Sequence, residues 1–361
     1  MFDILKKKEV NFSRQYNLDL LKALAIICMI ICHAVMQLGG HREGYETEAL
    51  YIFGDNVLGT YVAVAHAFMF AMGVGFMYSR KNTPVDLLKR GIHIYILAYV
   101  LNFFRYGIYA IGEGLITGTF REEVAYSMYT QDILHFAGLA MILTALFRKL
   151  KLKETTILLI AVAMSAFGSI VAGFTTDNTA LDVVLGTFVT TTSTESCFTL
   201  CNWYIFVAIG MVFGAVLKRM EKPEKLYKWI LPISGAIMVI YIIATCKFGM
   251  YFLTKNQFYF SVSTLEAFGF LSIDLFLLSA FYYLLKAVNP DRFKILYTMS
   301  KDVNSIYITH WVILGFIDAI FGYLLGMVLS YAVIYAIGII LIPISYVIAE
   351  LYGKTVKRFK K

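Results

Sequence analysis

The chain alternates long apolar runs with short polar segments over almost its whole length. A membrane-spanning helix needs about 20 mostly apolar residues, and ten runs are apolar enough to be candidates. Only one connection between them, residues 174–202, is long. The pattern predicts an all-α polytopic membrane protein, with residues 1–361 forming a single transmembrane domain. The expected helices lie at about 17–38, 56–79, 92–115, 131–147, 155–173, 203–217, 229–247, 263–285, 303–322 and 328–350.

Basic residues orient these helices. With the amino end in the cytoplasm, 26 of the 32 Lys and Arg residues fall in cytoplasmic segments and four in outer segments, while Lys22 and Arg105 lie inside spans. This distribution follows the positive-inside rule. It predicts that both termini are cytoplasmic, with short basic tails at 1–15 and 352–361. The Thr- and Ser-rich segment 174–202 becomes an outer loop, a candidate lid over an outward cavity.

Composition narrows the class of protein. Of the 361 residues, 59% are hydrophobic and 16% are charged, and the mean hydropathy is +0.70. Charged residues make up about a quarter of a typical soluble domain, so the low charged fraction excludes a soluble enzyme. The high hydrophobic fraction excludes a disordered chain. We expect a multi-pass integral protein of the cell membrane, in contact with lipid. The net charge of +8 marks a membrane face rather than a nucleic-acid surface. No ligand spacing for a metal is present in the sequence, so no metal is expected.

The first span carries ionisable residues, which are costly inside a bilayer and usually functional. Lys22 and His33 are eleven residues apart. Eleven steps of a 3.6-residue helix return almost to the same face, about 16 Å along the axis. Asp19 lies one turn before Lys22 on nearly the same stripe. The alternative interpretation is structural, with Lys22 reaching the interface beside Asp19 and His33 bonded to a neighbouring carbonyl.

Three motifs resemble those of known membrane acyltransferases. Lys22, ten residues and then His33, preceded by Asn17-Leu-Asp-Leu-Leu, resemble the first helix of the acyltransferase-3 family. The stretch Ala67-Phe-Met-Phe-Ala-Met-Gly-Val-Gly-Phe is similar to the family's second helix, although Met72 replaces its usual Ser. With Lys89-Arg90-Gly91, this stretch is also similar to the related heparan-glucosaminide N-acetyltransferase family. Ile306-Tyr-Ile-Thr-His-Trp resembles the Tyr-Leu-x-His-Trp of acyltransferase-3 proteins, and the ten-helix plan covers nearly the whole chain.

The resemblance implies transfer of an acyl group, usually acetyl, from cytoplasmic acetyl-CoA to a hydroxyl or an amine outside the membrane. A cell-surface polysaccharide or an amino sugar is the implied acceptor. His33 is then the catalytic base or the nucleophile of an acetyl-histidine intermediate. A carboxylate, Asp132 or Glu266, is expected to orient His33.

Other polar residues are assigned around this centre. We expect Arg105 to stabilise the developing oxyanion; the alternative is a buried pair with Glu113 or Asp132. His310 is interpreted as structural or channel-lining. Candidates for holding the CoA phosphates are Lys22, Arg80, Lys81, Lys89 and Arg90, of which the loop residues have ordinary positive-inside charge as their alternative. Candidates for contacting the acceptor are His66, Asn102, His135, Asn202 and Trp203.

A second class of function, a secondary transporter of a small polar or sugar-like solute, fits the ten spans and the intramembrane charges. The sequence shows no inverted repeat and no matched pair of Gly/Pro-broken helices, which are features of such transporters. A receptor without catalysis would leave the Lys22–His33 spacing unexplained. The acceptor, O- versus N-acylation and the oligomeric state are left open by the sequence.

Overall fold

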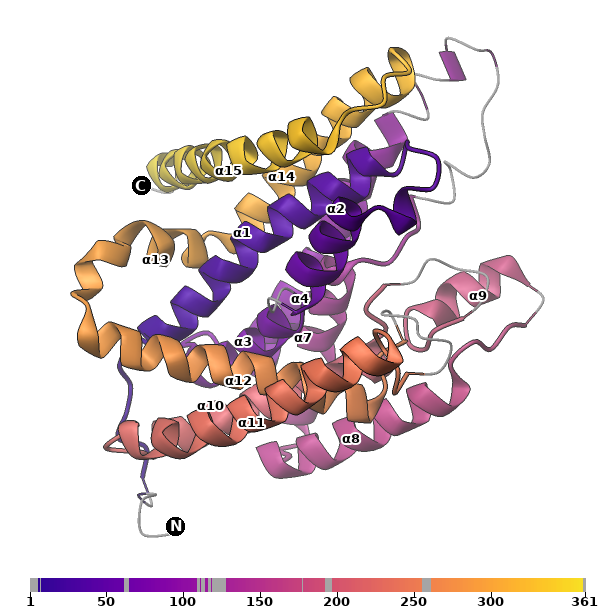
Figure 1. Ribbon diagram of the computed structural model, residues 1–361. Helices are drawn as coiled ribbons and strands as arrows, with labels where there is room; N and C mark the ends of the chain where they lie inside the picture. Colours follow the sequence, from indigo (N-terminus) through magenta and orange to yellow (C-terminus); the bar gives the residue numbers. More distant parts are fainter. Residues whose placement is uncertain are drawn as a thin grey trace. The chain divides into compact units, whose positions relative to one another are not determined.

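The computed structural model describes residues 6, 8–61, 65–108, 111, 114, 115, 118, 128–176, 178–191, 197–254 and 261–359 (Figure 1). Within these residues, every element of regular secondary structure is a helix. Nine of the helices are long and apolar enough to cross a membrane. The all-α, multi-pass architecture predicted from the apolar runs is therefore confirmed.

All ten predicted spans correspond to helical segments. The segment predicted at 131–147 is α7, whose 17 residues make it shorter than the nine long helices. Among the described residues, two short α-helices lie outside the spans, α9 (Thr179–Gly186) in the loop 174–202 and α13 (Lys294–Lys301), together with the 3₁₀ helices η2 (Tyr45–Thr47) and η7 (Pro290–Phe293). Residues 177 and 192–196 of that loop, and 360–361 of the carboxyl tail, lie outside the described residues. The spans are α1 (Tyr16–Gly39), α2 (Ala49–Ile52) with η3 (Phe53–Tyr61) and α3 (Ala65–Tyr78), α4 (Pro84–Asn102) with η4 (Phe103–Gly107), α7 (Ile133–Lys149), α8 (Glu154–Val171), α10 (Leu200–Lys218), α11 (Glu224–Phe248), α12 (Thr264–Ala287), α14 (Val303–Asp318) with η8 (Ala319–Leu324), and α15 (Tyr331–Phe359).

The third span begins earlier than predicted, at Pro84 instead of residue 92. Pro is favoured in the first turn of a helix because its missing N–H has no acceptor there. Thr83 and Asp86 add a reciprocal cap: the Thr83 hydroxyl donates to Asp86 Oδ2 at 2.7 Å, and the Asp86 N–H donates to Thr83 Oγ1 at 3.1 Å. These local signals start the helix before its apolar run begins.

The chain divides into two compact units. The first unit comprises Met1–Gln15, His66–Val100 and Tyr129–Tyr282, and the second comprises Tyr16–Ala65, Leu101–Met128 and Tyr283–Lys361. Each unit therefore collects segments that are distant in sequence. The expectation of one transmembrane domain stays a prediction.

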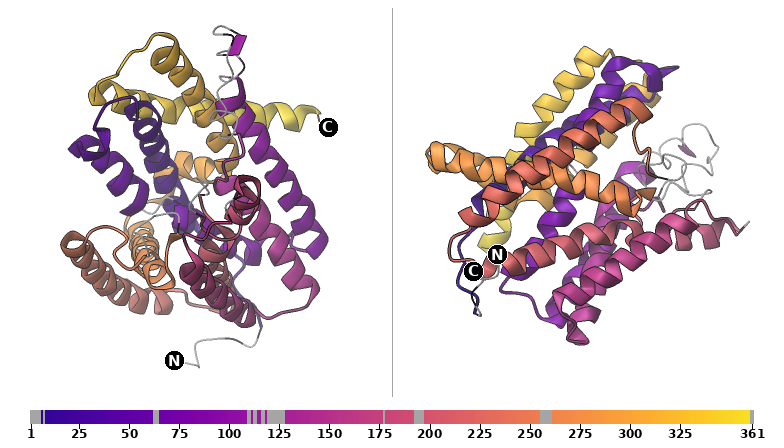
Figure 2. Two further views of the ribbon diagram at one scale, coloured as in Figure 1. Left: turned by 90° about the vertical axis from the view of Figure 1, so that its right-hand side faces the viewer. Right: turned by 60° about the horizontal axis from the view of Figure 1, so that its bottom comes forward.

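In the first unit, α8 and α10 run side by side (Figures 1 and 2). Close packing of α3 against α10 depends on two glycines. A Cβ atom at Gly73 would overlap the backbone of Val207, and one at Gly210 would overlap the carbonyl oxygen of Phe70. Small residues at such positions let two helix backbones approach each other in membranes. Gly75, two residues further along α3, does not contribute to this packing, because the space around it is open.

This difference gives a matched pair of variants. Gly73→Ala is expected to destabilise the protein by about 1–3 kcal/mol, because the new methyl group has to displace helix backbone. Gly75→Ala, two residues away on the same helix, should leave stability unchanged or slightly raised. Thermal unfolding of the two proteins in the same detergent measures the difference. Equal melting temperatures would contradict the packing of α3 on α10.

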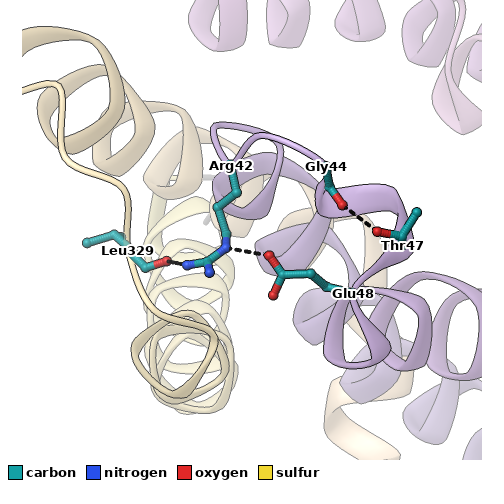
Figure 3. A network of polar contacts seen from close by, with 5 residues as sticks. All are labelled: Arg42, Gly44, Thr47, Glu48 and Leu329. Atoms are coloured by element: carbon teal, nitrogen blue, oxygen red, sulfur yellow. Dashed lines mark hydrogen bonds and ion pairs between the residues drawn. The ribbon is translucent and has the colours of Figure 1, made fainter.

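In the second unit, α13, α14, α15 and η3 pack on α1. The segment after α1 is fastened to the segment that leads into α15 (Figure 3). Arg42 Nε donates to Glu48 Oε1 at 2.9 Å, and its Nη1 donates to the carbonyl oxygen of Leu329 at 3.3 Å. The same guanidinium lies 5.0 Å from the ring centroid of Tyr331. These contacts hold the end of α1 that bears the polar residues described next.

Candidate functional site

The last turns of α1 and the turn that follows present polar side chains at intervals of four residues: His33, Gln37 and His41. Residues four apart lie on the same face of a helix. In the second unit, each of the three contacts a polar residue of α14. The sequence pattern of α1 and the packing of α14 together therefore build a polar strip between these two helices.

His33 is paired with a second histidine. Its Nδ1 lies 2.8 Å from Nε2 of His310, and the planes of the two rings are 16° apart, with centroids 5.1 Å apart. His33 is half-buried and His310 is fully buried. The contact that we expected from a carboxylate is therefore made by an imidazole.

The hydrogen bonds assign the protons of this pair. Nδ1 of His310 lies 3.0 Å from the carbonyl oxygen of Ile306, which only accepts, so Nδ1 carries the proton. In a neutral His310, Nε2 is then an acceptor, and Nδ1–H of His33 donates to it. The proton-accepting lone pair of a neutral His33 consequently resides on Nε2. This is the tautomer that a general base needs.

Trp311 and Arg105 complete the surroundings of His33. The Trp311 ring stacks on His33 with centroids 4.2 Å apart, and the guanidinium carbon of Arg105 lies 3.2 Å from the Trp311 ring centroid. Arg105 belongs to η4, close to the carboxyl end of its span. A cation over an indole face is favourable, most of all where water is excluded. Trp311 therefore contacts both the imidazole of His33 and the positive charge of Arg105.

A second polar cluster lies about two turns further along the strip. Asp318 is buried and accepts from Gln37 Nε2 at 2.6 Å and from His41 Nε2 at 2.5 Å. A Cβ atom at Gly322 would collide with the His41 ring, so this glycine makes room for the imidazole. These contacts hold the carboxyl-terminal end of α1 against the carboxyl-terminal end of α14.

At the other end of α1, Lys22 has protein partners. Its Nζ lies 3.6 Å from Asp19 Oδ1 and donates to the carbonyl oxygen of Ser300 at 3.1 Å. Asp19 Oδ1 also accepts from Ser300 Oγ at 2.6 Å. The pairing with Asp19, which was the structural alternative for Lys22, is thus present, and the contacts of both residues with Ser300 tie α1 to α13. The other four phosphate candidates, Arg80, Lys81, Lys89 and Arg90, are exposed near the start of α4.

Two of the expected residues, Asp132 and His135, form the amino-terminal cap of α7 in the first unit. The Asp132 carboxylate accepts from the Ile133 N–H at 2.6 Å, and the Asp132 N–H donates to His135 Nδ1 at 3.1 Å. The His135 ring also lies against the Tyr99 ring, with centroids 4.5 Å apart. Capping explains why this Asp and this His stand three residues apart.

Glu266 and His66 are also within the first unit, each with a buried partner. Glu266 accepts hydrogen bonds from the Tyr241 hydroxyl and from the Leu253 N–H. His66 Nδ1 lies 2.9 Å from Asp274 Oδ1, and neither side chain is exposed. Complete burial with a partner is typical of a structural pair, which favours that role for His66 over contact with an acceptor.

The remaining acceptor candidates are buried as well. Asn102 Nδ2 donates to the carbonyl oxygen of Met128 at 3.1 Å in the second unit. Asn202 Nδ2 donates to the carbonyl oxygen of Val262 at 3.0 Å in the first unit, and the Trp203 ring packs edge-on against Phe198. Glu113, the alternative partner of Arg105, lies outside the described residues.

Sequence reasoning placed His33 and Arg105 near each other and missed the residues that join them. His310 was interpreted as structural or channel-lining, and Trp311 and Asp318 were given no role. The motif Ile306-Tyr-Ile-Thr-His-Trp could have indicated this role, because it contains both His310 and the Ile306 carbonyl oxygen that accepts from its Nδ1–H. Helix periodicity does not connect it to α1, since His33 and His310 are 277 residues apart.

Residues 14–256 match the family described as heparan-alpha-glucosaminide N-acetyltransferase, catalytic. The match covers more than half of the chain and includes Lys22, His33 and Arg105, and it ends before α14. The motifs resemble two related families, acyltransferase-3 and heparan-glucosaminide N-acetyltransferase, and the match is to the latter. No curated protein matches the chain.

Proposed function

The chain belongs to the heparan-alpha-glucosaminide N-acetyltransferase catalytic family, and from this premise we propose that it transfers acetyl from cytoplasmic acetyl-CoA to an extracytoplasmic glycan or amino sugar. Membership supports a membrane acetyltransferase, and it favours this class over a transporter. The observation that carries the finer proposal is the hydrogen bond between His33 Nδ1 and His310 Nε2, which directs the basic nitrogen of His33 away from His310.

In the direct mechanism, Nε2 of His33 takes the proton from the acceptor as its oxygen or nitrogen attacks the thioester carbon. The carbon–sulfur bond breaks, and the thiolate of CoA takes the proton from the imidazolium. His33 is neutral again at the end of the cycle. Through both proton transfers, Nδ1–H of His33 remains bonded to His310, which keeps the ring in one orientation.

Arg105 is proposed to stabilise the negative charge that develops on the thioester oxygen. Its guanidinium is held at the Trp311 ring, and Trp311 itself stacks on His33. The Nε1–H of Trp311 is buried and makes no hydrogen bond to any described residue. We infer that it is a second donor to the same oxygen, because buried donors are rarely left unpaired.

The proposal places the enzyme in the cell membrane, with acetyl-CoA reaching it from the face that carries most Lys and Arg. Lys22, Arg80, Lys81, Lys89 and Arg90 are proposed to attract the CoA phosphates there.

The direct test is acetyl transfer by the purified protein in lipid nanodiscs. With acetyl-CoA and an amino sugar, we expect release of free CoA and an acetylated product in equal amounts. Absence of transfer to both amino sugars and glycan hydroxyls would contradict the proposed activity.

A covalent route is the alternative within the same site. Nε2 of His33 would attack the thioester carbon and expel CoA, and the proton on Nδ1 would pass to His310, giving a neutral acetyl-imidazole. Single-turnover experiments with labelled acetyl-CoA and no acceptor separate the two routes. For direct transfer we expect no label on the protein and no burst of CoA. Label that is retained on wild-type protein but not on His33→Ala would establish the covalent route.

A further inference from the structure

A polar cleft of about 310 Å³ lies in the first unit where α7 is followed by α8. Its walls come from the loop before α4, the end of α7, the first turn of α8, and α10. The mechanism above does not use it. The Lys and Arg count predicts that this connection lies on the cytoplasmic face. Residues that line it include Asn82, Pro84, Arg148, Lys151, Glu154 and Met211.

Arg148 is held in this cleft by backbone carbonyls. Its Nη1 donates to the Asn82 oxygen and its Nη2 to the Phe76 oxygen, each at 3.3 Å. The Nε of Arg148 is buried and has no hydrogen-bond partner in the part of the chain that the structure describes, and the same is true of Asn82 Oδ1. Arg148 lines the cleft and brings a positive charge to it, which favours an anionic ligand.

Lys151 enters the cleft from a strained backbone position. Its φ is +56°, where α7 ends and the Leu152 N–H bonds to the carbonyl oxygen of Phe147 at 3.0 Å. This position after a helix usually holds glycine, because a side chain in the left-handed region is strained. A cation is therefore present where glycine would give the more stable turn.

The start of α8 adds backbone donors. Lys153 is the N-cap residue of this 18-residue helix and makes no side-chain capping bond. The first N–H groups of a helix lack helical acceptors and favour an anion. Glu154 and Ile157 of the first turn line the cleft, and Glu154 is the one acidic residue among the lining residues.

We propose that this cleft binds the terminal 3′-phosphate of the acyl-CoA donor, an inference that rests on the proposed function. A phosphomonoester carries close to two negative charges at neutral pH. Arg148 attracts it through its positive charge, Lys151 binds it through its ammonium group, and the first turn of α8 binds it through backbone N–H groups. Glu154 opposes the phosphate and weakens its binding.

Lys151→Gly tests the cleft because it removes the cation and relieves the strained turn together. The measurement is calorimetric binding of acetyl-CoA and of 3′-dephospho-acetyl-CoA to the full chain in phosphatidylcholine nanodiscs. We expect the wild-type protein to bind acetyl-CoA about tenfold more tightly than the dephospho form, as for a charged hydrogen bond. Lys151→Gly should lose most of this preference without a lower melting temperature. Glu154→Gln should increase the preference.

The outcomes separate the cleft from the activity. If acetyl-CoA binds but both proteins keep the same preference, or neither has one, the cleft assignment is wrong while the proposed function stands. If acetyl-CoA does not bind at all, both fail. An anionic lipid headgroup is the other source of a phosphate. A melting temperature that rises with phosphatidylglycerol in wild-type protein only, with CoA binding unaffected by Lys151→Gly, would assign the cleft to lipid and overturn the proposal.

Discussion

His33→Ala is expected to lower kcat for acetyl transfer by about 10²- to 10⁴-fold, the range that a positioned general base contributes. The side chain is half-buried and stacks on Trp311, so its removal takes away the base and leaves the helix intact. KM for acetyl-CoA should change little, since the imidazole acts on the attacking group. Steady-state kinetics of CoA release in nanodiscs measure both parameters.

The control for this variant is His93→Ala. His93 is exposed on α4 and has no place in the proposed chemistry. We expect it to retain wild-type kcat, and both variants should elute as the same species in size-exclusion chromatography. Full activity in a folded His33→Ala protein would refute the assignment of His33, whichever of the two chemical routes operates.

His310→Leu is expected to lower kcat by about ten- to a hundredfold. Leucine cannot accept from His33 Nδ1–H, so a buried donor loses its partner at a cost of about 1–3 kcal/mol. The ring of His33 is then free to turn, and its basic Nε2 no longer has one orientation. Because His310 acts through His33, it is a positioning residue, and KM should stay near its wild-type value.

His310→Gln distinguishes positioning from mere filling of space. The glutamine amide oxygen can accept from His33 Nδ1–H, as Nε2 of His310 does. We expect this variant to recover most of the activity that is lost in His310→Leu. Similar losses in both variants, with unchanged melting temperatures, would contradict an acceptor role. If wild-type protein retains the acetyl label in single turnover, loss of that label in the His310 variants would instead show that His310 takes a proton.

The local part of the fold was predictable. Each apolar run became a helix because hydropathy and length are properties of a single segment. The third span was predicted eight residues too short at its start, since the apolar count ignored the cap formed by Thr83 and Asp86. The cap of α7 was likewise present in the sequence as Asp132 and His135, but both residues were assigned to the site.

The partner of His33 was not predictable in this way. A carboxylate was the expected partner because it is the usual one in catalytic triads. The structure has His310 there, and the two candidate carboxylates have local partners in the first unit. Packing also sets the exposed fraction of Trp203, which was a candidate for contacting the acceptor and is fully buried.

The sequence by itself determined that this is a membrane protein of helices, and that Lys22 and His33 share one face of the first helix. Both follow from apolar length and from the 3.6-residue period, which are local quantities. The tertiary structure decided which residues surround His33 and which of its nitrogens is basic. That choice depends on how α14 packs on α1 and how η4 packs on α14, and this packing brings His310 and Trp311 to His33, and Arg105 to Trp311, from distant positions in the chain.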